Sequence, residues 1–124
     1  MSKKILIIED DAALQKALTD TLTERGYAIV SAFDGEDGVA QANREHPDLI
    51  LLDIILPKKD GFSVLHEVKS NPAIAATPVI VLTNLEDSAD IERLLELGAT
   101  TFLTKTSYRL EDIAKKIQET LTVL

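Results

Sequence analysis

The chain has 124 residues, of which 45% are hydrophobic, and a formal net charge of −8. A chain of this length forms one domain, since a second would leave neither with a core of ordinary size. The acidic balance argues against a nucleic-acid-binding surface, which needs a basic patch, and the absence of cysteine excludes disulfides, thiolate zinc sites and cysteine nucleophiles.

The apolar run that follows Ser2-Lys3-Lys4 is too short for a signal peptide or a membrane span. We therefore expect a soluble, cytoplasmic protein with no membrane partner and no direct contact with nucleic acid. We also expect no second domain, because only three residues follow the last helical segment.

Short apolar runs alternate with longer amphipathic segments along the chain. The runs predicted to be strands are residues 4–8, 27–32, 49–52, 78–82 and 100–103. Continuous apolar runs of this kind are typical of strands buried on both faces, as in a parallel sheet covered by helices.

Five segments with helical periodicity follow these runs, at residues 12–25, 36–45, 62–70, 88–97 and 110–121. Asp11 and Asp34 are placed to cap the first two, and Gly26 to end the first. His46 and His66 are expected at the surface.

Four of the helical segments have a clear set of apolar positions. In the first these are Leu14, Ala17, Leu18, Thr21 and Leu22, and in the third they are Val64, Leu65 and Val68. In the fourth they are Ile91, Leu94 and Leu95, and in the fifth they are Ile113, Ala114 and Ile117.

This alternation predicts an α/β fold, a doubly wound five-stranded parallel sheet with right-handed crossovers, flanked by five helices. In such a sheet the functional groups lie at the carboxyl ends of the strands. Four strands deliver polar groups there, namely Glu9 and Asp10, Asp53, Thr83 and Lys105. The second strand delivers none. That fits the strand order 2-1-3-4-5, which leaves the other four strands side by side.

Glu9, Asp10 and Asp53 would then lie within a few ångströms of one another. Like charges so close destabilise a fold unless a cation compensates them. Carboxylate, carbonyl and water oxygens are the ligands that Mg²⁺ prefers, and a metal-held aspartate is a nucleophile that can form an acyl phosphate. Lys105 and the Thr83 hydroxyl would serve the phosphoryl oxygens. The residues therefore predict a divalent-cation site at which Asp53 accepts a phosphoryl group.

Each of these residues also has an ordinary explanation. Acids that precede a helix favour the positive end of its dipole, and for Asp11 we adopt that interpretation. Asp53 could be a turn acid and Lys105 a solvated lysine. Chance would then have to place all the polar groups at one edge of the sheet, which favours the functional interpretation.

The order and spacing of these residues resemble the receiver domains of two-component response regulators, which have the CheY-like, flavodoxin-like fold. The matching segments are residues 4–11, 48–53, 56–57, 60–61, 81–83, 97–99 and 102–105. The resemblance covers essentially the whole chain.

The resemblance implies a role for each residue of the site. Asp53 would be the phosphoacceptor, and Asp10 a direct ligand of Mg²⁺ (or Mn²⁺). Glu9 would reach the ion through water, and the main-chain carbonyl of Ile55 would complete the protein ligands.

The same resemblance makes Thr83 the switch hydroxyl and Lys105 the phosphate partner. The main chain at Asn84 would contact the phosphoryl group, and the rotamer of Phe102 would couple to Thr83. Taken alone, Phe102 is equally well explained as a core residue.

The implied function is a phosphorylation-controlled switch or phosphorelay carrier. The donor would be a phosphohistidine on a sensor histidine kinase or a phosphotransfer protein. Phosphorylation would remodel the fourth helix, fifth strand and fifth helix, whose face would bind a downstream protein. Such a protein catalyses only its own phosphorylation and dephosphorylation, so we do not expect an enzyme.

Two other classes of protein share parts of this pattern. A phosphatase with an aspartyl-phosphate intermediate needs a second acid two residues after the nucleophile, and that position holds Ile55. A pseudo-receiver binds partners without phosphorylation, and the intact set of Asp10, Asp53, Thr83 and Lys105 argues against it.

Two departures from the family pattern lead to further expectations. Thr106 follows Lys105 where most relatives have a proline in a cis peptide bond. Because a cis bond before threonine costs about 3 kcal/mol, we expect a trans bond. Ile55 and Leu85 place apolar groups at the mouth of the site, where they should hinder the attack of water on phosphorus and prolong the life of the phosphoryl group.

Overall fold

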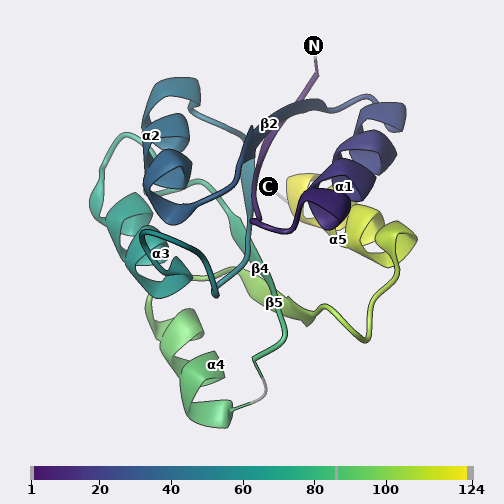
Figure 1. Cartoon of the computed structure of the whole chain (residues 1–124). Helices are drawn as coiled ribbons and strands as arrows, with labels where there is room; N and C mark the ends of the chain where they lie inside the picture. The colour runs from purple at the N-terminus through teal and green to yellow at the C-terminus, as the bar shows by residue number, and fades with distance from the viewer. Residues whose placement is uncertain (1, 86, 123–124) are drawn as a thin grey trace.

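Five parallel strands lie between two layers of helices (Figure 1). The structure is a computed structural model that describes residues 2–85 and 87–122. The strands are β1 (Lys4–Ile8), β2 (Ala28–Ala32), β3 (Leu49–Leu52), β4 (Val79–Thr83) and β5 (Thr101–Thr104). The helices are α1 (Ala12–Glu24), α2 (Gly35–Glu45), α3 (Gly61–Ser70), α4 (Ser88–Glu96) and α5 (Leu110–Thr122). Every predicted element is confirmed, with ends that differ by a residue at most.

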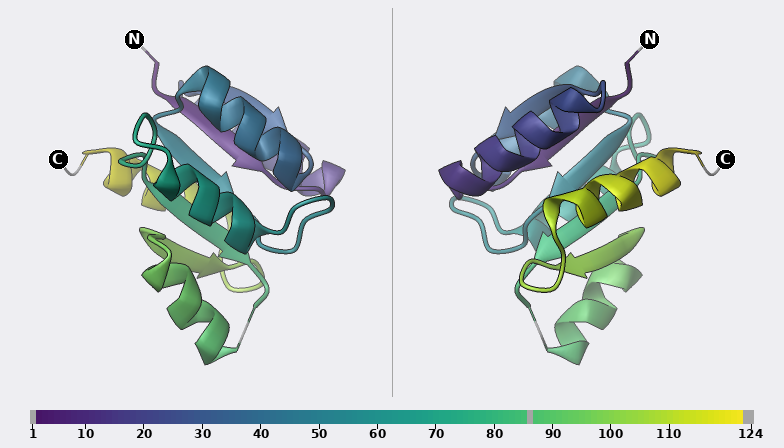
Figure 2. Two further views of the ribbon diagram at one scale, coloured as in Figure 1. Left: turned by 90° about the vertical axis from the view of Figure 1, so that its left-hand side faces the viewer. Right: turned by 90° about the vertical axis from the view of Figure 1, so that its right-hand side faces the viewer.

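The strand order is β2-β1-β3-β4-β5, as predicted. Helices α2, α3 and α4 cover one face of the sheet, and α1 and α5 cover the other, as the two views in Figure 2 show. The fold is therefore the CheY-like, doubly wound α/β sheet. No helix in the described ranges is long and apolar enough to cross a membrane.

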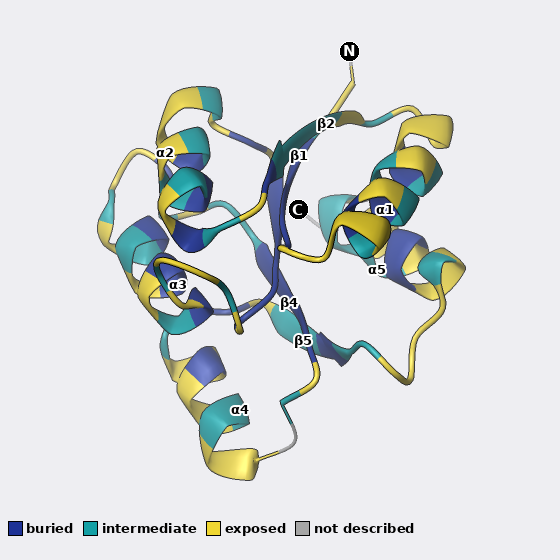
Figure 3. Ribbon diagram, viewed as in Figure 1, coloured by how far each residue is buried: buried dark blue, intermediate teal, exposed yellow. Residues whose placement is uncertain are grey.

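The three central strands send alternate side chains into two separate cores. One core lies under α2, α3 and α4 and includes Leu6, Ile8, Ile50, Leu52, Val79 and Val81. The other lies under α1 and α5 and includes Ile5, Ile7, Leu49, Leu51, Ile80 and Leu82. Because both faces of these strands are covered, their continuous apolar runs are explained. These central strands are dark blue, the colour of buried residues, in the middle of Figure 3.

The two edge strands and α4 are less buried than their apolar runs predict. β2 and β5 each have only one neighbouring strand, and most of their residues are partly exposed. On α4, Leu94 is buried and Ile91 is partly buried, but Leu95 is 48% exposed. Leu95 belongs to the apolar repeat of this helix but lies on its exposed side, since α4 lies beyond the central strands (Figure 1) and Leu94 is its buried residue.

The predicted helix ends are confirmed by their hydrogen bonds. The Asp11 carboxylate accepts from the main-chain N–H groups of Ala13 and Leu14, and Asp34 accepts from that of Asp37. Gly26 follows α1 with a φ of +93°, a conformation that suits glycine. His46 and His66 are both exposed, as expected.

Gly61 allows α3 to begin directly against the loop that follows Asp53. Its N–H donates to the Ile54 carbonyl oxygen at 2.8 Å. A Cβ atom at this position would lie 2.5 Å from the Ile54 Cα and 2.6 Å from the Asp53 carbonyl oxygen, both of them backbone atoms. Glycine is therefore required for this close approach.

We predict that Gly61→Ala lowers the free energy of unfolding by about 2 kcal/mol, because the backbone must move to relieve the overlap. Urea denaturation measures this change. Gly26→Ala is the control. A Cβ there meets nothing within 4 Å, so only the strain of positive φ is added, at about 1 kcal/mol. Equal losses in the two variants would contradict the steric explanation.

Candidate functional site

Three carboxylates converge where β1 and β3 end. Glu9 and Asp10 follow β1, and Asp53 follows the neighbouring β3, where its N–H donates to the Ile8 carbonyl oxygen at 3.0 Å. One carboxylate oxygen from each acid lies within 4.8 Å of the other two. Glu9 and Asp53 are only 2% and 5% exposed, whereas Asp10 is exposed. The acidic cluster therefore opens to solvent on the Asp10 side.

Lys105 brings the one cation that pairs with this cluster in the described part of the chain. Its Nζ lies 2.7 Å from Glu9 Oε1 and 3.0 Å from Asp53 Oδ2. Its main-chain N–H donates to the Thr83 carbonyl oxygen at 3.0 Å, which holds the end of β5 against β4. Three carboxylates and one ammonium leave two negative charges, which is the charge that one divalent cation neutralises.

Burial and neighbouring charges shift the pKa values of two groups in the site. Burial and the nearby Asp53 charge raise the pKa of Glu9, although the hydrogen bonds from Lys105 and the Asp11 N–H act in the opposite direction. Burial alone would lower the pKa of Lys105, but its hydrogen bonds and charge interactions with Glu9 and Asp53 together outweigh burial and raise it. The lysine therefore stays positively charged at neutral pH.

Main-chain N–H groups fix the orientation of both buried carboxylates. Asp53 Oδ1 accepts from the Ile54 N–H at 2.7 Å, and the Ile55 N–H lies 3.4 Å from the same oxygen. Glu9 Oε2 accepts from the Asp11 N–H at 3.0 Å. These contacts preorganise the acids, so little reorganisation is needed when a ligand arrives.

The predicted switch residues lie on the adjacent strands. Thr83 is completely buried at the end of β4, and its hydroxyl oxygen accepts from the Leu85 N–H at 3.4 Å. Phe102 is paired in register with Val81 and packs, partly buried, against the core under α2, α3 and α4. Asn84 is exposed.

The loops around the cluster bear on two further expectations. Ile55, two residues after Asp53, is 64% exposed, whereas Leu85 is partly buried and packs against the core under α2, α3 and α4. No cis peptide bond occurs within residues 2–85 and 87–122, and the Lys105–Thr106 bond is trans as expected.

The residues of the cluster fit a divalent cation. All three side chains offer carboxylate oxygens, the hard ligands of Mg²⁺ and Mn²⁺. The three carboxylates carry two more negative charges than the Lys105 ammonium compensates, and a divalent cation would neutralise this excess. Asp10, the exposed acid, leaves a route for the ion from solvent.

Sequence reasoning missed Gln15, a buried residue that contacts this region from α1. Its side-chain nitrogen donates to three main-chain carbonyl oxygens, one of them that of Glu9. A signal was present, since Gln15, Leu18 and Leu22 have the i, i+3, i+7 spacing of an inward stripe, and these are the buried residues of α1.

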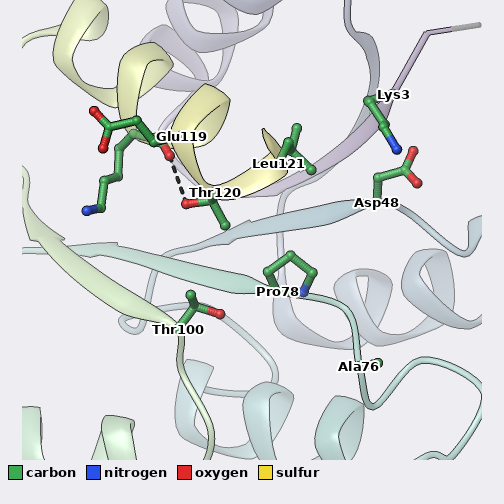
Figure 4. A pocket seen from close by; sticks show the side chains of 9 residues that line it. Lys3, Asp48, Ala76, Pro78, Thr100, Glu119, Thr120 and Leu121 are labelled. Carbon is green, nitrogen blue, oxygen red and sulfur yellow. Dashed lines mark hydrogen bonds between the residues drawn. The ribbon is translucent and has the colours of Figure 1, made fainter. Parts of the chain in front are cut away.

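A pocket of about 590 Å³ lies at the opposite end of the sheet, around the amino ends of the strands (Figure 4). Lys3, Asp48, Pro78, Thr100 and Leu121 are among the residues that line it. It shares no residue with the acidic cluster. The pocket is therefore separate from the acidic cluster at the carboxyl ends of the strands.

Comparison with known families shows which family the chain belongs to. The family model of the response regulator receiver domain matches residues 5–118, so the chain belongs to that family. Receiver domains of two-component systems are phosphorylated by histidine kinases and bind Mg²⁺ through an acidic pocket. They are signalling domains and generally not classical enzymes.

Among curated proteins, the chain is similar to the transcriptional regulatory protein CiaR of Streptococcus pneumoniae, with 41% identity over 95% of this chain and 51% of CiaR. It is 40% identical to the probable transcriptional regulator ycf27 of Porphyridium aerugineum, over 83% of this chain and 42% of that protein. The chain thus spans about two fifths of the length of ycf27 proteins.

Several solved structures match nearly the whole length of this chain. The Mn²⁺-bound response regulator Rcp1 is 34% identical, with a TM-score of 0.82 over 98% of this chain and 96% of that one. The phosphorylated cyanobacterial phytochrome response regulator RcpA is 33% identical, with a TM-score of 0.86 over 99% and 96%. A CheY-like receiver domain protein from Methanospirillum hungatei has a TM-score of 0.91 at 27% identity, over 98% and 94%.

We predict that Lys105→Met destabilises the protein by about 1–3 kcal/mol at neutral pH when divalent cations are removed with a chelator. The change leaves two buried carboxylates without their cationic partner, and the cost is reduced by the solvent that reaches the lysine. Urea denaturation measures it. Lys16→Met is the control, because that exposed lysine pairs only with exposed Asp20 among the described residues and should change stability little. An equally small effect at Lys105 would contradict this view of the site.

Proposed function

We propose that residues 1–124 form a receiver domain that works as a phosphorylation-controlled switch or phosphorelay carrier, with Asp53 as the phosphoacceptor. One observation carries the proposal, namely the convergence of the Glu9, Asp10 and Asp53 carboxylates with the Lys105 ammonium. The Mn²⁺-bound Rcp1 and phosphorylated RcpA structures support it, because they are similar to this chain from end to end.

Asp10, Asp53 and the main-chain carbonyl of Ile55 would hold Mg²⁺ or Mn²⁺, and Glu9 would reach the ion through water. When bound, the cation supplies positive charge that stabilises the phosphoryl oxygens during transfer. The main-chain N–H groups after Asp53 keep its carboxylate in place for both roles.

The proposed donor is a phosphohistidine of a sensor histidine kinase or a phosphotransfer protein. A carboxylate oxygen of Asp53 forms a bond to phosphorus while the phosphorus–nitrogen bond of the donor breaks. The electron pair of that bond returns to the imidazole nitrogen, which takes up a proton. Lys105, already 3.0 Å from Asp53, is close enough to contact the new phosphoryl group. The chain would catalyse only this transfer and the later hydrolysis.

The proposed signal leaves through α4, β5 and α5. Thr83 and Phe102 occupy neighbouring strands, since β4 and β5 pair in register from Ile80 to Thr83. We propose that Thr83 turns its hydroxyl from the Leu85 N–H towards the phosphoryl group, supported by the main chain at Asn84, and that Phe102 then turns further inward. The added charge favours the conformation that makes these contacts, and a downstream protein would bind the altered face.

We expect incubation with acetyl phosphate and Mg²⁺ to add one phosphoryl group to the wild-type protein, as measured by intact mass spectrometry. Asp53→Asn should gain none, because it lacks the nucleophilic carboxylate. Asp60→Asn is the matched control. Asp60 caps α3 through the Ser63 N–H, a bond that asparagine can also accept, so this variant should be phosphorylated normally. A wild-type protein that stays unmodified would favour a pseudo-receiver.

We further predict that Ile55→Asn and Leu85→Glu speed up loss of the phosphoryl group several-fold. The main-chain N–H groups of Ile55 and Leu85 contact Asp53 Oδ1 and the Thr83 hydroxyl, so polar side chains at these two positions can orient an attacking water. The decay of phosphoprotein after removal of the donor measures the rate. Leu95→Glu, on the exposed face of α4, should decay like wild type. Unchanged rates for Ile55→Asn and Leu85→Glu would contradict the hypothesis that the apolar residues slow hydrolysis of the phosphoryl group.

A further inference from the structure

Gln15 carries a buried side-chain amide close to the acidic cluster. It lies in the second turn of α1 and is only 3% exposed. Along the same helix stripe the other buried side chains are Leu18 and Leu22. A buried amide is costly unless its polar atoms are hydrogen-bonded, so its contacts indicate what it does.

The amide nitrogen of Gln15 donates towards three main-chain carbonyl oxygens. They are those of Ile7 at 3.1 Å, Ala32 at 3.1 Å and Glu9 at 3.3 Å. The orientation of the amide is fixed, because its oxygen in the same place would face three other oxygens. Among the described residues the Gln15 oxygen has no hydrogen-bond partner. All three contacts of the side chain with the backbone therefore use it as a donor.

These carbonyls lie where β1 leaves the sheet. On one side, the Glu9 N–H donates to the Ala32 carbonyl oxygen at 3.0 Å, and on the other the Asp53 N–H donates to the Ile8 carbonyl oxygen at 3.0 Å. After these bonds the chain turns into α1 through Asp10. Gln15 binds the backbone on the β2 side of this exit, opposite the bond to Asp53.

We propose that Gln15 is a positioning residue for the cation site. Its amide fixes the peptide of Glu9, and thereby keeps the carboxylates of Glu9 and Asp10 in place opposite Asp53. This role rests on the proposed function, since it takes the divalent cation as the ligand. Groups that orient metal ligands contribute about 10- to 100-fold to metal affinity.

Gln15→Met tests the role, because methionine has a similar length and no donor. Mg²⁺ alone is titrated into the folded wild-type and variant chains by calorimetry, and the variant is expected to bind about tenfold more weakly. Leu22→Ala is the matched control. It removes buried atoms from the same stripe of α1, so it lowers stability but should leave the Mg²⁺ affinity unchanged.

Two results of this titration would overturn the role of Gln15. One is a methionine variant that binds Mg²⁺ as tightly as wild type. The other is an equal loss of affinity in Gln15→Met and Leu22→Ala, which would show general loosening of α1. A wild-type protein that binds no Mg²⁺ would contradict the proposed function, and this inference with it.

A second measurement needs only the wild-type chain, and so it holds even if Gln15→Met does not fold. The side-chain amide protons of Gln15 should exchange with water more slowly than those of exposed Gln118, and their NMR signals should shift when Mg²⁺ is added. Gln15 signals that exchange as fast as those of Gln118 and ignore Mg²⁺ would overturn the inference.

Discussion

The bridge that Lys105 makes between Glu9 and Asp53 is the interaction on which the site depends. It joins the ends of β1, β3 and β5 through one ammonium group, at 2.7 Å and 3.0 Å from the two carboxylates. Because both acids are almost fully buried, their repulsion would oppose folding without this cation. The bridge is nevertheless incomplete, since Asp10 adds a third negative charge. The Lys105 bridge therefore reduces the repulsion between the buried acids but leaves the cluster with a net negative charge.

The net negative charge of this cluster connects the fold to the proposed function. Parallel strands in the order β2-β1-β3-β4-β5 bring four strand ends to one edge, and the helix that follows each strand leaves that edge open at the carboxyl ends. A divalent cation, and then a phosphoryl group, would each change the balance of charge around Lys105. Lys105 and Thr83 are also linked through the main chain. The proposed change at Asp53 would therefore act on β4 and β5 through contacts between neighbouring strands.

Most of the fold could be predicted from the sequence because its signals are local and periodic. The apolar runs fixed the strands to within a residue, and caps such as Asp11 and Asp34 marked the helix starts. The clustering of acids followed from topology alone. The exposure of Leu95 could not be predicted, since periodicity cannot tell how much of a helix the sheet will cover. Gln15 was missed for a related reason, because a polar residue in an apolar stripe reveals its partners only when distant backbone segments, here β1 and β2, are brought together.

The most direct test is to titrate Mg²⁺ into the wild-type chain and into Asp10→Asn and follow the heat of binding. We expect a single site in wild type and an affinity at least about tenfold weaker in Asp10→Asn, because that change removes one negative charge and replaces a carboxylate with a neutral amide. Absence of binding in wild type, or the same affinity in both chains, would show that the excess charge of the acidic cluster is not what binds the ion.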